Sequence, residues 1–165
     1  MSAPAPKETI VKVAEWAALR GEGVIVTLGL GSCVAIMLHD ATAGAGAMAH
    51  ILLPSRSLAR DTTNPARFPE TAVPFLVGQL EALGADPRRL VAKLAGGASM
   101  FAQLMAPGSV QMGERNIVAA RNALRAASVP LAREAVGGGQ GRSVRFHIAD
   151  GRVEIRSVGA DAVII

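Results

Sequence analysis

Residues 26–54 read VTLGLGSCVAIMLHDATAGAGAMAHILLP and carry the strongest strand signals in the chain. The β-branched start is typical of a buried strand, while apolar runs over 34–39 and 46–53 predict two more strands joined by a turn at 40–45. Glycines crowd the join between the first two strands, and the chain's only cysteine, Cys33, lies there. The stretch therefore predicts a buried strand followed by an antiparallel hairpin, with a thiol where they meet.

The flanking sequence adds further strands and two helices. Residues 70–83 and 114–127 have apolar residues at helical spacing, although Pro74 implies a late start or a kink in the first helix. Asp150-Gly151 is the strongest hairpin signal and suits a type I′ turn. The other predicted strands cover 9–19, for which a helix is the alternative, 89–101 up to a Gly-Gly turn, 129–136, and both arms of a hairpin over 142–158. About seven strands and two longer helices indicate an α/β fold.

Length and composition predict one domain in a reducing compartment. The 165 residues are 50% hydrophobic but only 3% aromatic, so the core must be built from aliphatic side chains. We expect a single domain over 9–165 and a disordered lead over 1–8. A lone cysteine cannot form an internal disulfide, and the start of the chain has no export signal. We therefore expect a cytoplasmic protein.

Several classes of ligand are disfavoured. The net charge of +4 comes from dispersed arginines, and aromatic side chains for base stacking are scarce, so nucleic-acid binding is not expected. No segment is apolar enough for membrane insertion. GLGSCV lacks the third glycine of a dinucleotide fingerprint, and GGGQGR lacks the Lys-Ser/Thr ending of a phosphate loop. Metal-ligand spacing is absent, and we expect no metal and no cofactor.

Geometry ranks the three histidines as partners for the thiol. If residue 39 faces 46 across the hairpin, then Cys33 faces residue 52, and His50 shares its face as a diagonal neighbour roughly 7–8 Å away. A slip of one residue would move His50 to the other face. His39 lies far along the strand, and His147 belongs to another hairpin. A Cys33–His50 pair is therefore one reading, and an inert, buried cysteine is the other.

Residues around the thiol can complete such a site. The Thr27 hydroxyl can accept a hydrogen bond from His50, although strand threonines are commonly present for β-propensity alone. Gly29 and Gly31 let the backbone turn and expose amide N–H groups near Ser32 that can stabilise an oxyanion. A plain turn would explain the same glycines.

Five motifs together resemble the chemoreceptor glutamine deamidases of the CheD family. These are VTLGLGSCVAIMLHD, GAMAHILLP, KLAGGASMF, MGERN and GRSVRFHI, in the family's order along nearly the whole chain after the lead. The resemblance implies a single-domain layered α/β sandwich of mixed β-sheet with flanking helices, related to the catalytic domain of cytotoxic necrotizing toxins. It also implies hydrolysis of glutamine side chains on methyl-accepting chemoreceptors, with the family's catalytic residues at Cys33, His50 and Thr27.

The same resemblance implies partners. These are the cytoplasmic helices of chemoreceptors and a CheC-type phosphatase that competes for the receptor-binding face. Arg56, Arg60 and Arg67 are candidates for docking acidic receptor helices, with a solvated loop as the alternative. Two other functions stay open: a non-catalytic chemotaxis adaptor, and a thiol hydrolase acting on receptor methyl esters. The glycine-rich GGGQGR segment and the loop over 55–68 depart from the family pattern and leave substrate choice open.

Overall fold

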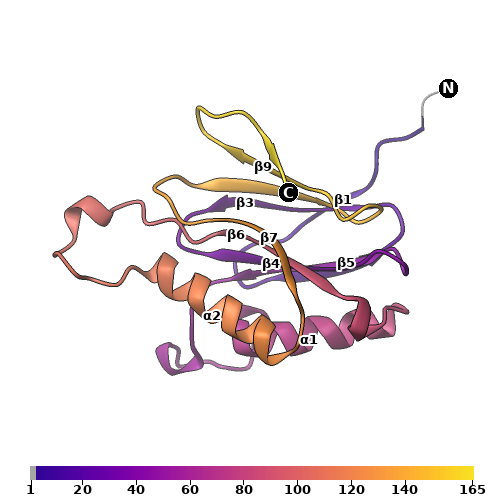
Figure 1. Ribbon diagram of the computed structural model, residues 1–165, viewed down its shortest axis with the longest axis horizontal. Coiled ribbons are helices and arrows are strands. Elements are labelled where there is room, and N and C mark those ends of the chain that lie inside the picture. The colour runs from indigo at the N-terminus through magenta and orange to yellow at the C-terminus, as the bar shows by residue number, and fades with distance from the viewer. Residues whose placement is uncertain (1–2) are drawn as a thin grey trace.

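The computed structural model describes residues 3–165 and arranges them in three layers (Figure 1). Two five-stranded sheets, A and B, pack face to face, and two α-helices cover the outer face of sheet B. Both sheets are mixed, so the predicted α/β class with mixed sheet and flanking helices is confirmed. Within the described residues there are ten strands, more than the seven expected.

Sheet A has the strand order β1-β3-β8-β9-β10. Its first pair is parallel and its other pairs are antiparallel. Side chains such as Ile25, Val144 and Phe146 point from this sheet into the core that it shares with sheet B. The strands are β1 (Glu8–Ile10), β3 (Val24–Leu30), β8 (Arg142–His147), β9 (Val153–Ser157) and β10 (Val163–Ile164).

Sheet B has the order β2-β5-β4-β6-β7, and only β6 and β7 run parallel. Every residue of β4 and β5 is buried, because sheet A covers one face of these strands and the helices cover the other. The strands are β2 (Trp16–Arg20), β4 (Val34–Asp40), β5 (Ala45–Ile51), β6 (Val91–Gly96) and β7 (Leu131–Val136).

The two predicted helices are present. They are α1 (Pro69–Ala82) and α2 (Met112–Ala126), and each buries an aliphatic stripe against sheet B. Pro74 neither delays nor ends α1: it lies inside the helix on the exposed side. No helix within residues 3–165 has the length and apolar character needed to span a bilayer.

The β4–β5 hairpin has the predicted register. His39 pairs with Gly46, as predicted. Val34, which follows Cys33, pairs with Ile51, as the same register requires. The buried Asp40 carboxylate fixes the turn, because it accepts hydrogen bonds from the N–H groups of Thr42 and Ala43. This register is what brings His50 to the face of sheet B that carries Cys33.

Residues 9–19 are not one strand, and that prediction was wrong. The segment divides into β1 in sheet A and β2 in sheet B, with Ala14 between them in the left-handed region at φ 62°. The exposed residues 3–7 lie outside any helix or strand, and β1 begins at Glu8, the last residue of the expected lead. Residues 1 and 2 of that lead lie outside the described residues.

The turn between β8 and β9 also differs from its prediction. A type I′ turn needs positive φ at both central residues. Gly151 has φ 79°, but Asp150 is not in the positive region. The connection spans 148–152 and is closed by Gly151 N–H donating to the His147 carbonyl, so the hairpin is real but its turn is longer.

Candidate active site

The segment Gly31–Cys33 links sheet A to sheet B, and its three carbonyl oxygens are held by different donors. Gly31 O accepts from Ala98 N at 2.8 Å, and Cys33 O accepts from Gly97 N at 2.8 Å. Ser32 O accepts from the side chain of Asn116 at 2.9 Å. Within residues 3–165 the N–H groups of Ser32 and Cys33 donate to no protein acceptor. These two amides are therefore free to bind a ligand oxygen.

Glycines after β6 let its end approach this segment closely. Gly96 has φ 107°, and a Cβ on it would overlap the Cys33 carbonyl oxygen. Gly97 has φ 67°, and a Cβ on it would overlap Ile117 Cγ1 on α2. The Gly-Gly pair, read from the sequence only as a turn, therefore sets the position of the cysteine backbone.

Cys33 is partly exposed and packs at the edge of the core between the sheets. Burial raises the pKa of its thiol, and no cation is among the causes of that shift. The resting side chain is therefore a neutral thiol at neutral pH, and it needs a base to become a nucleophile.

His50 is the base nearest in register to the thiol. It lies on β5 opposite Ala35, is 2% exposed, and shares the inner face of sheet B with Cys33. Burial lowers the pKa of His50, while hydrogen bonding to the Val11 backbone and the negative charge of Glu15 oppose that shift. The imidazole is therefore neutral at neutral pH and can accept a proton.

The Thr27 hydroxyl fixes the tautomer of His50. Thr27 Oγ1 lies 2.7 Å from His50 Nδ1 and 2.6 Å from the Val11 carbonyl oxygen. The carbonyl can only accept, so the hydroxyl donates its hydrogen to Val11 and accepts from Nδ1–H. The expected Thr27–His50 contact is thus present, and it leaves the lone pair of His50 on Nε2.

That Nε2 atom is buried and, among the described residues, has no hydrogen-bond partner, the Cys33 thiol included. An unsatisfied buried acceptor is uncommon in native proteins and is typical of sites where a proton is to be received. The arrangement can thus take a proton from a group placed next to Nε2. Whether that group is the Cys33 thiol stays a prediction.

Two of the three predicted arginines have structural partners. Arg56 pairs with Glu70 at 3.1 Å, and Arg67 donates to the Asp61 carbonyl, while Arg60 is exposed. No group of three or more metal-ligating side chains within residues 3–165 is arranged to hold a metal ion.

Sequence reasoning missed Asn116. It lies on α2, is fully buried, and donates from Nδ2 to Ser32 O and to Leu52 O. The only signal was its presence in the MGERN motif, to which no role was attached. A polar residue on the inner side of an otherwise apolar helix stripe is the pattern that could have drawn attention to it.

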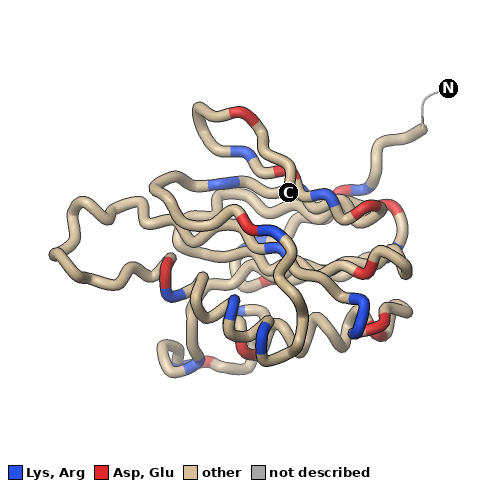
Figure 2. The backbone as a smooth tube through the Cα atoms, in the orientation of Figure 1, with Lys and Arg blue, Asp and Glu red and all other residues tan. Residues whose placement is uncertain are grey.

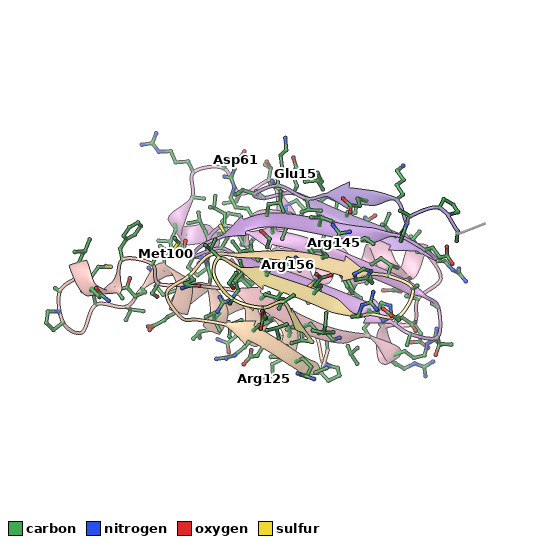
Figure 3. The ribbon with its side chains drawn as sticks, turned by 90° about the horizontal axis from the view of Figure 1, so that it is seen from above. Glu15, Asp61, Met100, Arg125, Arg145 and Arg156 are labelled. Atoms are coloured by element: carbon green, nitrogen blue, oxygen red, sulfur yellow. The ribbon has the colours of Figure 1, made fainter. Side chains whose placement is uncertain are left out.

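A long loop over 99–111 begins beside the cysteine segment and extends past the end of the sheets (Figure 1). Met100, labelled in Figure 3, lies at its start, and a Cβ on Gly31 would be 3.3 Å from the Met100 sulfur. A cleft of about 440 Å³ lies between Gly29, Met100 and the residues 139–143. Neither Cys33 nor His50 is among the residues that line this cleft.

Comparison with known proteins identifies the family. The family model for CheD, described as chemotactic sensory transduction, matches residues 52–157. A probable chemoreceptor glutamine deamidase CheD of Moorella thermoacetica is 42% identical over 161 residues, which cover 97% of this chain and 96% of that protein. The chemoreceptor glutamine deamidase CheD of Thermotoga maritima is 41% identical over 150 residues, which cover 91% of this chain and 92% of that protein.

A third relative, the probable chemoreceptor glutamine deamidase CheD of Caldanaerobacter subterraneus subsp. tengcongensis, is 36% identical over 149 residues. The alignment covers 90% of this chain and 92% of the relative. The relatives' alignments take in most of the chain, beyond the part that the family model covers. The chain belongs to the CheD family.

Proposed function

We propose that this protein hydrolyses the side-chain amide of selected glutamine residues on chemoreceptors to give glutamate and ammonia. The names of the relatives support the reaction and its substrate. The observation that carries the mechanism is the His50 imidazole, held by Thr27 through Nδ1 and left with an unpartnered lone pair on Nε2. Cys33 is the nucleophile, His50 the base, and Thr27 the residue that orients the base.

In the first step the thiol proton moves to His50 Nε2 while the Cys33 sulfur attacks the amide carbon of the substrate. The carbonyl π electrons move to oxygen, and the backbone N–H groups in the Gly31–Cys33 segment stabilise the oxyanion. Each donor in such a position contributes about 3 kcal/mol to transition-state binding. When the tetrahedral species collapses, His50 gives its proton to the leaving nitrogen. Ammonia leaves, and the substrate acyl group remains bound to Cys33 as a thioester.

In the second step water hydrolyses the thioester. His50 takes a proton from the water, whose oxygen attacks the thioester carbon and forms a second oxyanion in the same place. Collapse of this species breaks the carbon–sulfur bond, and His50 returns the proton to sulfur. The net reaction consumes one water, releases one ammonia and restores the neutral thiol and imidazole.

The test is incubation of purified protein with a receptor cytoplasmic fragment, read by ammonia release and by mass spectrometry. Conversion of one glutamine to glutamate adds about 1 Da to the fragment. Cys33→Ala should abolish both signals and keep the circular dichroism spectrum, since the thiol is small and lies at the core edge. An unchanged fragment mass with the unmodified protein would support the adaptor function, and methanol release would support the esterase.

The exposed loop over 99–111 supports a protein substrate. It holds no Lys, Arg, Asp or Glu, as Figure 2 shows, and it exposes Phe101, Leu104 and Val110. An exposed apolar patch beside a candidate nucleophile is typical of a surface that binds another protein. We propose that receptor helices dock here and that a CheC-type phosphatase, where present, competes for the same surface.

We also propose that residues 9–165 form one domain, that the protein works in the cytoplasm, where the receptor domains it modifies would lie, and that its layers are related to the catalytic domain of cytotoxic necrotizing toxins. The support for the last point is the layered α/β arrangement itself.

A further inference from the structure

Asn116 connects the two segments that carry the proposed nucleophile and base. Its Nδ2 donates to Ser32 O at 2.9 Å and to Leu52 O at 3.2 Å. Ser32 immediately precedes Cys33, and Leu52 follows His50 by two residues. Both partners are carbonyl oxygens, so the atom facing them must be the nitrogen of the amide.

The hydrogen bond from Asn116 to the Ser32 carbonyl also fixes the direction of the Cys33 N–H. In a trans peptide the C=O of one residue points opposite to the N–H of the next, so the Ser32 carbonyl and the Cys33 N–H are antiparallel. Among the described residues, the Ser32 carbonyl accepts no backbone hydrogen bond, and Asn116 is its only side-chain partner. Without Asn116 this peptide plane would be free to rotate, and the Cys33 N–H with it.

The Gly31 carbonyl needs no support from a side chain. Gly31 O is held by the backbone N–H of Ala98, which fixes the Ser32 N–H in the same way. Of the two amides proposed to stabilise the oxyanion, one is therefore oriented by backbone and the other by a single side chain.

Stability alone does not account for asparagine at this position. The neighbouring inward positions on α2 are apolar, including Ile117 and Ala120, and Asn116 is itself fully buried. Its Oδ1 is buried without a hydrogen-bond partner in the described chain, which costs stability. A buried asparagine whose unpaired Oδ1 lowers stability points to a role beyond packing.

We propose that Asn116 is a positioning residue that orients the Cys33 amide toward the oxyanion and holds the Cys33 segment at a fixed place relative to the end of β5. This inference rests on the proposed deamidation and extends it. Asn116 touches neither substrate nor reacting atoms; it acts through the Ser32–Cys33 peptide.

The test compares two reactions of the same thiol in Asn116→Ala. Deamidation of a receptor fragment passes through an oxyanion, whereas alkylation of Cys33 by iodoacetamide displaces iodide at a saturated carbon and forms none. We expect kcat for deamidation to fall by about 10- to 100-fold, with KM and the alkylation rate within about twofold of the unmodified protein. Asn122→Ala, on the exposed side of the same helix, is the matched control and should change neither reaction.

Asn116→Asp supplies an independent readout. Its ionised carboxylate would face two carbonyl oxygens and repel both, whereas the protonated acid has an O–H that can donate to Ser32 O. Deamidation by this variant, as a fraction of the unmodified rate at each pH, should rise as pH falls, and the corresponding fraction for Asn116→Ala should stay flat.

Three results would overturn the proposal: kcat of Asn116→Ala within twofold of the unmodified protein, an equal fall in deamidation and alkylation, or loss of the folded circular dichroism signal in both Asn116 variants. The last result would make Asn116 a structural residue. Failure of the deamidase function itself is distinct, because the unmodified protein would then leave the fragment mass unchanged.

Discussion

The chemistry of the candidate site depends on which nitrogen of His50 carries the hydrogen. A hydroxyl has one hydrogen, and Thr27 gives it to the Val11 carbonyl, so its oxygen must accept from His50 Nδ1. A carboxylate in place of Thr27 would stabilise the imidazolium more strongly, whereas a hydroxyl orients the ring and leaves it neutral. The candidate site therefore combines a neutral imidazole with a neutral thiol.

Replacing Thr27 tests its role as orienting residue. Thr27→Val keeps the shape but removes the hydroxyl that contacts both Val11 O and His50 Nδ1 in the core, which should lower the free energy of unfolding by about 1–3 kcal/mol. It should also lower kcat for deamidation by about tenfold or more, less than Cys33→Ala. Thr27→Ser, which keeps the hydroxyl, should restore most of the rate in steady-state assays.

Comparable rates for Thr27→Val and Thr27→Ser would contradict this role, since only the valine lacks a hydrogen-bond acceptor for His50. Thermal unfolding of both variants provides the control for loss of folded protein.

The pH dependence of the reaction follows from the burial of His50. Because burial lowers the pKa of His50, the base stays neutral down to a pH below its ordinary 6.5. We expect kcat/KM to be level near neutrality and to fall as pH drops through that lowered pKa. Burial raises the pKa of Cys33, so the thiol is neutral in this range. Because His50 would remove the thiol proton during the attack, the rate should not require a pH at which the thiol ionises on its own.

The same shift has a consequence for stability. The unfolded chain binds a proton at His50 near 6.5 while the folded chain does not, so the free energy of unfolding should fall as pH decreases below 6.5. Denaturation curves of His50→Gln should lack this part of the dependence. An inflection in kcat/KM above 6.5 would contradict a neutral, buried base.

How far the site follows from sequence differs between its residues. That His50 lies on the same face of sheet B as Cys33 could be predicted, because strand alternation and a short turn determine the register of a hairpin. The position of Asn116 could not, since α2 reaches Ser32 only through the packing of a helix separated from it by 84 residues. The tautomer of His50 required the Val11 carbonyl, which belongs to a segment whose fold the sequence did not reveal.

At the level of elements, the failure over 9–19 has a physical reason. The chain crosses from sheet A to sheet B at Ala14, whose left-handed backbone is unfavourable for a residue with a Cβ. No glycine or proline marks the turn, so the apolar run reads as continuous. Tertiary contacts hold it instead: Ala14 N donates to His50 O, and Asn64 Nδ2 donates to Ala14 O.

The end of β6 is the element on which the cysteine segment rests, and Gly96 tests this. Gly96→Ala places a Cβ against the Cys33 carbonyl oxygen as well as straining a positive φ. Gly159→Ala is the matched control, because Gly159 also has positive φ, 74°, but has open space around it. We expect Gly159→Ala to cost about 1 kcal/mol in denaturant unfolding and Gly96→Ala at least about 2 kcal/mol more.

Gly96→Ala should also reduce the deamidation rate of the protein that remains folded, since the Cys33 backbone must move to relieve the overlap. Equal unfolding free energies for the two variants would mean that β6 does not constrain the cysteine segment.

At the scale of the whole molecule, the three layers enclose two separate hydrophobic cores. Helices and sheet B form one aliphatic core, sheets A and B form a second, and the candidate site lies where the chain passes from β3 to β4 between the sheets. The strand order could not be predicted, because β1, β3 and β8 come together from distant parts of the chain. The uncharged loop over 99–111 extends from this end of the molecule (Figure 2).

If that loop binds the receptor, substitutions that weaken this binding should leave the rate of the chemical steps unchanged. Phe101 and Leu104 are 67% and 83% exposed, so serine at both positions removes apolar contact area without opening the core. We expect the double variant to raise KM for a receptor fragment by about tenfold or more, with kcat and the alkylation rate of Cys33 unchanged. Val163→Ser, an exposed apolar site on β10, is the control and should leave KM as it is. A fall in kcat at constant KM would instead place the loop in the chemistry, and no change in either constant would place receptor binding on another face.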